Sequence, residues 1–222
     1  MADGNRETMT MDLAGIRREY LKAGLSRQNL LADPVQQLNT WLQQAISMEL
    51  ADPTAMILST VSASKAPSQR IVLLKHLDEA GLVFYTNYAS HKARDMAENQ
   101  QVSLHFPWYA IERQVSVGGL VSKVSAEESD RYFSSRPRES QIAAWASAQS
   151  EPLSSRDELL QRYQQTLARF ADRDVPRPEG WGGYRVQAVQ FEFWQGGAHR
   201  LHDRFCYTRN ASGSWDISRL SP

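Results

Sequence analysis

Residues 194–205 read Trp-Gln-Gly-Gly-Ala-His-Arg-Leu-His-Asp-Arg-Phe and are the most informative stretch of the chain. If a strand begins at Arg200, its side chains alternate between two faces, and Arg200, His202 and Arg204 share one of them. Three potentially cationic groups side by side repel one another unless an anion lies among them. Arginine also offers phosphate two parallel hydrogen bonds. The stretch therefore indicates an anion pocket that is partly enclosed by the flanking aromatic residues; a solvated basic edge strand is the alternative.

A second basic cluster lies in the first half of the chain. Residues 68–75 place Arg70 and Lys75 near the two ends of an apolar run typical of a strand. Glu79-Ala80-Gly81 then supplies a turn, and residues 82–86 are the expected return strand of a hairpin. Arg70 and Lys75 are five positions apart and would face opposite sides of a flat strand. They could contact different parts of one long ligand.

A short helix is expected after the turn at residues 86–89, with Ser90 as its N-cap and Lys92 in its first turn. The free N–H groups of such a helix start can bind a phosphate. An ordinary surface cap is the alternative.

Several sequence blocks, taken in order and at their spacing, resemble the pyridoxamine 5′-phosphate oxidase family, FMN enzymes that make pyridoxal 5′-phosphate. The resemblance covers nearly the whole chain, from Arg17-Arg18-Glu19-Tyr20 to Arg219-Leu220-Ser221-Pro222. The blocks between these ends are Ala51-Asp52-Pro53-Thr54-Ala55-Met56, residues 69–75, Val83-Phe84-Tyr85-Thr86-Asn87, Phe106-Pro107-Trp108, Glu112-Arg113-Gln114-Val115 and residues 134–142.

The family resemblance implies an α+β fold, the FMN-binding split β-barrel with surrounding helices, in a homodimer that holds FMN at its interface. Residues 1–10 are polar and lack periodicity, so a disordered tail is expected there. The resemblance implies an N-terminal lid and helix segment over 11–32 and a single domain over 33–222. The patterning itself predicts strands near 54–62, 69–76, 82–86, 101–106, 112–124, 184–194, 200–208 and 214–219. It predicts helices over 13–23, from Asp33-Pro34 onward, and near 126–135, 138–148 and 156–171.

Helix starts and one apolar stripe support these assignments. Ser125 with Glu128, and Ser155 with Glu158, fit the capping-box pattern. The helix after Asp33 has an apolar stripe made of Val35, Leu38, Trp41 or Leu42, Ala45 and Ile46.

The resemblance assigns the ligand contacts position by position. The implied FMN contacts are Arg70, Lys75, Tyr85, Thr86, Lys92 and Ser150, the backbone of Ile71, Val72, Leu73 and Leu74, and Gln114, Gln149, Trp194 and Arg204. Some of these are supplied across the dimer interface. The implied substrate-phosphate group is Lys75, Tyr132, Arg136 and Ser140, each of which can donate a hydrogen bond. Arg200 and His202 match the catalytic positions over the substrate ring, and Arg17 and Tyr20 match a lid over the site.

His91 departs from the family pattern, which has arginine between the serine and the lysine. Histidine can donate one hydrogen bond to the FMN phosphate but lacks the bidentate fork of arginine. FMN is therefore expected to be held less tightly than in the family. Its affinity is expected to fall further as the pH rises and the imidazole loses its proton. Alternatively, Arg70 and Lys92 suffice and His91 is only a surface residue.

The function implied is oxidation of pyridoxine and pyridoxamine 5′-phosphates to pyridoxal 5′-phosphate, by hydride transfer to FMN with O₂ as the final acceptor. O₂ becomes H₂O₂, and the amine substrate releases NH₃ when its imine is hydrolysed. Two alternatives stay open: another flavin oxidoreductase of the split-barrel fold, and a non-catalytic protein that binds pyridoxal phosphate. The remaining tryptophans (Trp41, Trp108, Trp145, Trp181 and Trp215) are expected to pack in the core or an interface.

Composition is consistent with this function. The 25 basic and 25 acidic residues balance, which argues against a nucleic-acid or membrane partner. The single Cys206 is expected in the core, and His199-x-x-His202 has no further patterned ligand nearby, so no metal is expected. The N-terminus has no apolar segment typical of a signal peptide, which predicts a cytoplasmic protein.

Overall fold

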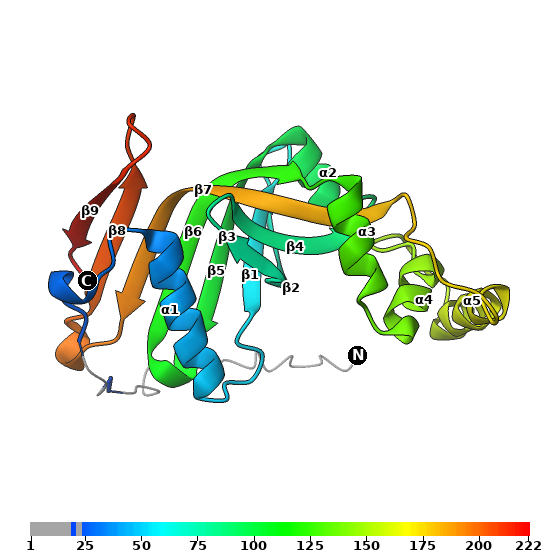
Figure 1. The fold of residues 1–222 in the computed structure, drawn as a ribbon, viewed down its shortest axis with the longest axis horizontal. Coiled ribbons are helices and arrows are strands. Elements are labelled where there is room, and N and C mark those ends of the chain that lie inside the picture. Colours follow the sequence, from blue (N-terminus) through cyan, green and yellow to red (C-terminus); the bar gives the residue numbers. More distant parts are fainter. Residues whose placement is uncertain (1–18, 21–23) are drawn as a thin grey trace, which may run out of the picture.

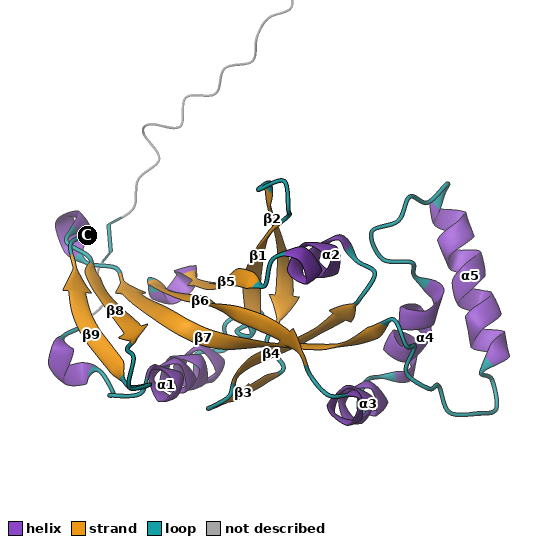
Figure 2. Cartoon of the chain, turned by 90° about the horizontal axis from the view of Figure 1, so that it is seen from above, coloured by secondary structure: helices purple, strands orange, loops and turns teal. Residues whose placement is uncertain are grey.

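The computed structural model describes residues 19–20 and 24–222, and in them one curled antiparallel sheet is surrounded by helices (Figures 1 and 2). The strands are β1 (Ala55–Val61), β2 (Pro67–Leu73), β3 (His76–Asp78), β4 (Gly81–Asn87), β5 (Gln101–Trp108), β6 (Arg113–Lys123), β7 (Trp181–Gln195), β8 (Asp203–Arg209) and β9 (Trp215–Leu220). Their order is β2-β1-β5-β6-β7-β4-β3, and β8 and β9 extend the sheet from β7. This is the α+β split-barrel class that the family resemblance implies.

Strand β7, with 15 residues, runs from the region of α3 to β8 (Figure 1). Its first half, from Trp181 to Val186, pairs with β4, and its last six residues, Gln190 to Gln195, pair with β8. The long strand therefore carries two different regions of the protein at its two ends.

The described helices are α1 (Pro34–Ser47), α2 (His91–Glu98), α3 (Ala126–Ser134), α4 (Arg138–Ala146) and α5 (Arg156–Arg169), with short 3₁₀ turns η1 (Arg27–Asn29), η2 (Tyr109–Ile111) and η3 (Ala198–Arg200). Three of the expected helix starts are confirmed. Asp33 Oδ1 accepts a hydrogen bond from Val35 N at 2.8 Å. Ser125 and Ser155 accept from the backbone of Glu128 and Glu158.

Ser90 precedes α2 as expected, but its hydroxyl does not cap the helix. It donates instead to the carbonyl of Asn87 at 2.7 Å, so it closes the preceding turn.

Helix α1 covers one face of the sheet, and the main core lies between them (Figure 2). Trp41 and Leu42 are both buried, and the Trp41 ring meets Phe193 of β7 edge to face with centroids 5.2 Å apart. Ile46 was expected on the buried stripe, but 44% of it is exposed. Its neighbour Ala45 lies at the edge of the stripe. Ile46 is the next residue along the helix, and its side chain therefore points away from the stripe toward solvent.

A smaller core lies under α3, α4 and α5, at the end of the molecule where β7 begins. Phe133, Ile142, Phe170, Val175 and Trp181 form it. Cys206 is buried in β8, in agreement with the expected core position.

Two predicted elements are wrong. The run at 69–76 is not one strand and does not pair with 82–86. Strand β2 ends at Leu73 and pairs with β1, whereas the short β3 forms the hairpin with β4. At the junction, Leu74 N donates to Thr54 O and Lys75 N donates to Val83 O, so the chain crosses between sheet edges there.

The strand expected from Arg200 is also wrong at its start. Residues Ala198–Arg200 form η3, and β8 begins only at Asp203. His199 and Arg200 have φ values of 54° and 65°, in the left-handed region. Strand alternation therefore does not place Arg200 on one face with His202 and Arg204.

The expected tail over 1–10 and most of the expected helix over 13–23 lie outside the described residues. Each helix of the described part of the chain is too short or too polar to span a membrane.

Candidate functional site

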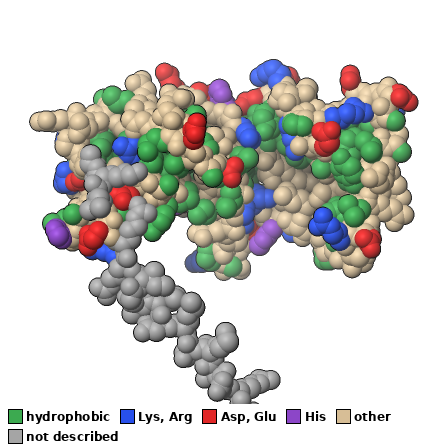
Figure 3. Space-filling view, turned by 90° about the horizontal axis from the view of Figure 1, so that it is seen from below, with side chains coloured by type: hydrophobic (Ala, Val, Ile, Leu, Met, Phe, Trp, Pro, Cys, Tyr) green, Lys and Arg blue, Asp and Glu red, His purple; other side chains and the backbone are tan. Residues whose placement is uncertain are grey.

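A cavity of about 840 Å³ opens between β2, β4 and the segments that carry α2, α3 and α4. The expected contacts that line it are Arg70, Ile71, Val72, Leu73, Lys75, Tyr85, Thr86, His91, Lys92, Tyr132, Arg136, Ser140, Gln149 and Ser150. The face of the molecule shown in Figure 3 is hollowed near its middle, where Lys and Arg side chains and a histidine gather. Residues more than 80 positions apart in the sequence thus meet around one space.

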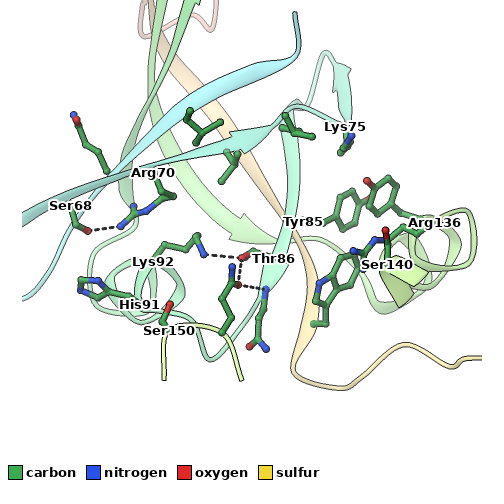
Figure 4. A pocket seen from close by; sticks show the side chains of 18 of the residues that line it. Ser68, Arg70, Lys75, Tyr85, Thr86, His91, Lys92, Arg136, Ser140 and Ser150 are labelled. Atoms are coloured by element: carbon green, nitrogen blue, oxygen red, sulfur yellow. Dashed lines mark hydrogen bonds between the residues drawn. The ribbon is translucent and has the colours of Figure 1, made fainter. Parts of the chain in front are cut away.

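One end of the cavity, called here the basic end, consists of Arg70, His91 and Lys92 (Figure 4). Arg70 Nη1 donates to Thr60 Oγ1 at 2.7 Å, and Arg70 Nη2 donates to Ser68 Oγ at 2.6 Å. These bonds fix the guanidinium against the sheet. An arginine held in this way loses little side-chain freedom when it binds an anion.

Lys92 lies almost fully buried at the basic end. Its ammonium donates to Thr86 Oγ1 and Ser90 Oγ, both at 3.1 Å. Burial, together with the nearby charge of Arg70, lowers the pKa of Lys92 to about 8. A phosphate in this space would stabilise the charged form of the lysine and raise its pKa again.

The other end, called here the aromatic end, is built around Tyr85, Tyr132 and Trp181. The rings of Tyr85 and Tyr132 stack with centroids 3.8 Å apart, and Tyr85 also stacks on Trp181. Gly183 makes this possible, because a Cβ there would lie 2.7 Å from the Tyr85 ring. Burial, with a smaller contribution from Glu128, raises the pKa of Tyr85 to about 12, so its phenol stays neutral and can donate a hydrogen bond.

Arg136 leaves part of its guanidinium available at the aromatic end. It lies over the Trp181 ring at 4.6 Å, and its Nη1 is buried without a hydrogen-bond partner in the described residues. A buried donor without a partner costs roughly 1–3 kcal/mol, which an anionic ligand would offset. Lys75 and Ser140 lie on the same side of the cavity (Figure 4).

A separate group of expected site residues lies at the other end of β7. Trp194, His202 and Tyr20 pack together, with ring centroids 4.6 to 5.6 Å apart. Gly196 admits Tyr20, because a Cβ at Gly196 would lie 2.7 Å from the tyrosine ring. The Arg200 guanidinium lies 5.8 Å from the centre of the same ring. We call Tyr20, Trp194, Arg200 and His202 the C-terminal group.

The backbone N–H of Gly197 donates to His202 Nδ1 at 3.1 Å. This bond requires Nδ1 to be unprotonated, so the neutral ring carries its proton on Nε2. Burial, helped by the nearby charge of Arg200, lowers the pKa of His202. At neutral pH the ring is therefore a donor through Nε2.

Arg204 and Gln114 lie beside Trp194 on the neighbouring strands. Arg204 Nε donates to Glu192 at 2.8 Å, and its Nη1 donates to Ser221 O at 2.9 Å. The Glu192 carboxylate raises the pKa of Arg204. Gln114 and Trp194 line a small cavity of about 120 Å³ together with Tyr20.

The C-terminal group is far from the cavity within one chain. Trp181 belongs to the aromatic end, and Trp194 lies thirteen positions later on the same strand. At about 3.3 Å per residue the strand between them is roughly 40 Å long. One chain alone does not bring the two sets of residues around one ligand.

The cavity differs from the expected contact set in a few residues. Leu74 is buried in the main core and does not line the cavity, although the resemblance implies a backbone contact there. Arg17 lies outside the described residues. Trp181 was expected to serve packing only, yet it also lines the cavity, along with Ser68, Gln69, Asn87, Ser135 and Pro137. The spacing of Tyr85 and Trp181 in the sequence gave no signal for this, because β4 and β7 meet only through sheet pairing.

Over residues 19–20 and 24–222, no three His, Cys, Asp or Glu side chains come together in a group that could hold a metal ion.

Comparison with known proteins identifies the architecture. Residues 42–169 match the family model "Pyridoxamine 5'-phosphate oxidase", and residues 181–222 match "Pyridoxine 5'-phosphate oxidase C-terminal dimerisation region". Among solved structures, PhzG from Burkholderia lata 383, in complex with tetrahydrophenazine-1-carboxylic acid, is similar with a TM-score of 0.83 and 27% identity, over 88% of this chain and 95% of that one. An FMN-binding protein from Nostoc punctiforme shares the fold with a TM-score of 0.70 at 13% identity, over 87% of this chain and all of that one.

Curated relatives are similar over almost the full length. The pyridoxine/pyridoxamine 5′-phosphate oxidase of Teredinibacter turnerae is 58% identical over 96% of this chain and all of its own. The enzyme of the same name from Hahella chejuensis is 57% identical over the same shares. By family model, full-length identity and fold, the chain belongs to the pyridoxamine 5′-phosphate oxidase family.

Proposed function

We propose that this protein oxidises pyridoxine 5′-phosphate and pyridoxamine 5′-phosphate to pyridoxal 5′-phosphate with bound FMN. The observation that carries the proposal is the cavity. It has cationic groups at both ends and stacked aromatic rings beside the cations of the aromatic end, in a chain 58% identical to an enzyme of that name. A ligand pair with a phosphate at each end and flat rings in the middle fits this distribution of charge and apolar surface.

The basic end fits the FMN phosphate. Arg70 and Lys92 would hold it, with Ser150 as a neutral donor beside them and Thr86 accepting a hydrogen bond from Lys92. The lowered pKa of Lys92 supports this assignment, because it reflects a buried cation whose neighbourhood holds more positive than negative charge. Gln149 reaches the same region and accepts a hydrogen bond from Thr86 Oγ1 at 3.2 Å.

The aromatic end fits the substrate phosphate. Arg136 has a buried donor without a protein partner, and Lys75, Tyr132 and Ser140 line the same part of the cavity. All four groups can donate a hydrogen bond to a phosphate dianion. The neutral Tyr132 phenol, whose pKa burial raises, keeps its proton for that purpose.

The C-terminal group completes the site in a homodimer, contributed by the second copy of the chain. Three observations support this. The group lies roughly 40 Å of strand away from the cavity of its own chain. Three of its members, Trp194, Arg200 and His202, fall within the segment whose family model is described as a dimerisation region. In addition, Ile71 on the edge strand β2 leaves 70% of its apolar side chain uncovered beside the cavity.

Bound FMN would supply the redox chemistry: it accepts a hydride equivalent from the substrate carbon and passes the electrons to O₂, which leaves as H₂O₂. The residues of the chain place the substrate. Arg200 would orient the substrate and stabilise developing charge, and His202 would hold the substrate ring through Nε2–H. Trp194, Gln114 and Arg204 would contact the flavin from the second copy. No side chain is assigned as an obligatory base, and a cytoplasmic location remains a prediction.

The test is the visible spectrum of the purified protein, followed by anaerobic addition of pyridoxine 5′-phosphate. Flavin bands that bleach with substrate and return with O₂, with H₂O₂ formed, are the expected result. A yellow protein that does not bleach would indicate a different flavin enzyme of this fold, and dependence on a nicotinamide donor would identify a reductase. A colourless protein that takes up no FMN would indicate a binding protein for pyridoxal phosphate.

A further inference from the structure

Asp95 is a buried carboxylate directly behind the basic end of the cavity, and the functions described so far do not use it. It lies in α2 and is only 3% exposed. Its Oδ2 accepts hydrogen bonds from Thr60 Oγ1 at 2.6 Å and from Ser68 Oγ at 2.8 Å. These are the same two hydroxyls that accept from Arg70.

The direction of these hydrogen bonds follows from proton counting. A hydroxyl carries one proton, and an arginine can only donate. Since Thr60 and Ser68 each give their proton to the carboxylate, each presents only lone pairs to Arg70. Their mutual contact at 3.1 Å then carries no proton. Asp95 therefore makes both hydroxyls acceptors for the guanidinium.

The result is an arginine with a fixed orientation. Arg70 Nη1 donates to Thr60 Oγ1 and to Leu58 O, and Nη2 donates once, to Ser68 Oγ. The N–H of Nε makes no hydrogen bond to a described residue. Arg70 lines the cavity, so its guanidinium, held at Nη1 and Nη2, lies where a ligand could accept from it.

Asp95 also contacts a second member of the basic end. His91 lies one helical turn earlier, with its Nε2 3.5 Å from Asp95 Oδ1. Burial alone would raise the pKa of Asp95, but hydrogen bonds from Thr60 and Ser68 and the charges of His91 and Arg70 lower it. The carboxylate is therefore ionised at neutral pH, with one oxygen directed to each basic residue.

We propose that Asp95 is a positioning residue for the FMN phosphate: through Thr60 and Ser68 it holds Arg70 in the orientation that binds the phosphate. This inference rests on the proposed function, because it takes FMN as the ligand. The carboxylate does not itself face the ligand. The two hydroxyls lie between it and Arg70, whose Nη2 is 4.0 Å from Oδ2, and Lys92 keeps the basic end positive.

The test compares two flavins that differ only in the phosphate. Asp95→Asn keeps the size of the side chain but removes its charge, which weakens the hydrogen bonds that it accepts from Thr60 and Ser68 and so loosens the orientation of both hydroxyls toward Arg70. In full-length protein freed of flavin, dissociation constants for FMN and riboflavin are measured by quenching of flavin fluorescence. We expect FMN affinity to fall by about tenfold or more, the scale for a hydrogen bond to a charged group, while riboflavin affinity stays within about twofold of wild type.

A matched control and a milder variant accompany this measurement. Glu98→Gln changes a carboxylate on the same helix that accepts from Ala63 N, away from Arg70, and should alter neither dissociation constant. Ser68→Ala removes one of the two hydroxyls and should give a smaller, FMN-selective loss. It also keeps the inference testable if Asp95→Asn does not fold, which is checked by circular dichroism and the melting temperature. In an Arg70→Gln background, Asp95→Asn should have little further effect on FMN affinity.

The outcomes separate the inference from the proposed function. If FMN and riboflavin affinities fall together, Asp95 is only structural and the inference is wrong. It is equally wrong if Asp95→Asn binds FMN as wild type does, or if its effect is unchanged in the Arg70→Gln background. A wild-type protein that binds neither flavin would contradict the proposed function itself.

Discussion

The cavity and the C-terminal group are built in different ways, although both hold residues implied to contact the same ligands. At the cavity, Arg70, Thr86 and Tyr85 stand on regular strands, and hydrogen bonds or stacked rings fix their side chains. In the C-terminal group, Arg200 is exposed on a 3₁₀ turn where two successive residues adopt left-handed backbone conformations. Each such residue costs of the order of 1 kcal/mol or more.

This difference indicates which half of the site can bind a ligand by itself. The cavity already holds enclosed cations and aromatic surface within one chain. The C-terminal group has a strained backbone and an exposed arginine that lies far from the cavity of its own chain. We therefore expect the cavity to provide most of the flavin affinity and the C-terminal group to act in the second copy, on substrate placement.

The largest expected effect comes from a pair of variants, one altered only in the cavity and the other only in the C-terminal group, which are then combined in one dimer. Arg136→Met removes a cavity residue, and Arg200→Met removes a residue of the C-terminal group. Each variant alone should lose roughly 100-fold or more in kcat/KM, because each loses a charged contact in a water-poor site. In a 1:1 mixture of chains paired at random, about a quarter of all sites combine two unaltered halves, so about a quarter of wild-type activity should return.

Activity of the co-expressed mixture, compared with that of each variant, checks this prediction. A mixture that stays as inactive as its parents would mean that the two regions do not form one site across a dimer.

The second prediction concerns the cavity alone and depends on pH. Lys92 has a pKa lowered to about 8, so its ammonium form, which binds phosphate, is lost as pH rises above that value. FMN affinity of the flavin-free protein should fall between pH 7 and 9, and riboflavin affinity should not. Lys92→Met should weaken FMN binding at pH 7 by about 30-fold and remove the pH dependence.

Titration of both flavins by fluorescence quenching at several pH values checks it. Lys123→Met serves as the control, since Lys123 lies over the Tyr88 ring and not in the cavity. A wild-type FMN affinity that is flat over this pH range would contradict the role given to Lys92.

The extent to which the sequence predicted each region follows from the range of the interactions involved. Most strand positions, the described helices, and the starts at Asp33, Ser125 and Ser155 depend on nearby residues and were predicted correctly. The predicted pairing of 69–76 with 82–86 was wrong: β2 joins β1, and the early end of β2 at Leu73 depends on contacts with Thr54 and Val83. The turn at η3 was missed because His199 and Arg200 adopt conformations that side chains of their type rarely take.

The residues of the candidate site could be predicted mainly from the family resemblance. Most of the implied FMN and phosphate contacts line one cavity, which no local pattern indicates, because β2, β4 and α4 meet only in the fold. Trp181 and Asp95 were missed. Trp181 reaches the cavity only through the pairing of β7 with β4, and Asp95 acts at one remove through Thr60 and Ser68.

A smaller effect is expected from a substitution at Tyr20, the member of the C-terminal group that the resemblance assigns to a lid. Tyr20 packs edge to face on Trp194 and His202, so Tyr20→Ala should release both rings. Aromatic contacts of this kind contribute about 1 kcal/mol each, which predicts a rise of about fivefold in KM, or faster product loss, with a smaller change in FMN affinity because the cavity supplies most of it. Steady-state and stopped-flow kinetics check this, with Arg17→Ala added in a second variant. Kinetics identical to wild type would exclude a lid role.

The smallest effect is predicted for His91, and it tests how complete the basic end is. His91 has 59% of its side chain exposed, and its nearest acid is Asp95 at 3.5 Å. In His91→Arg, the planar fork would add a second hydrogen bond to the FMN phosphate, but at an exposed position this contributes at most about 1 kcal/mol.

We therefore expect the FMN dissociation constant of His91→Arg to fall by about twofold to fivefold. His76→Arg is the matched control, because His76 is also exposed and also paired with a carboxylate, Asp78, but lies outside the cavity. An affinity unchanged in His91→Arg would mean that Arg70 and Lys92 already satisfy the phosphate. The FMN affinity of the basic end would then depend on the buried hydrogen bonds that hold Arg70 rather than on an additional exposed cation.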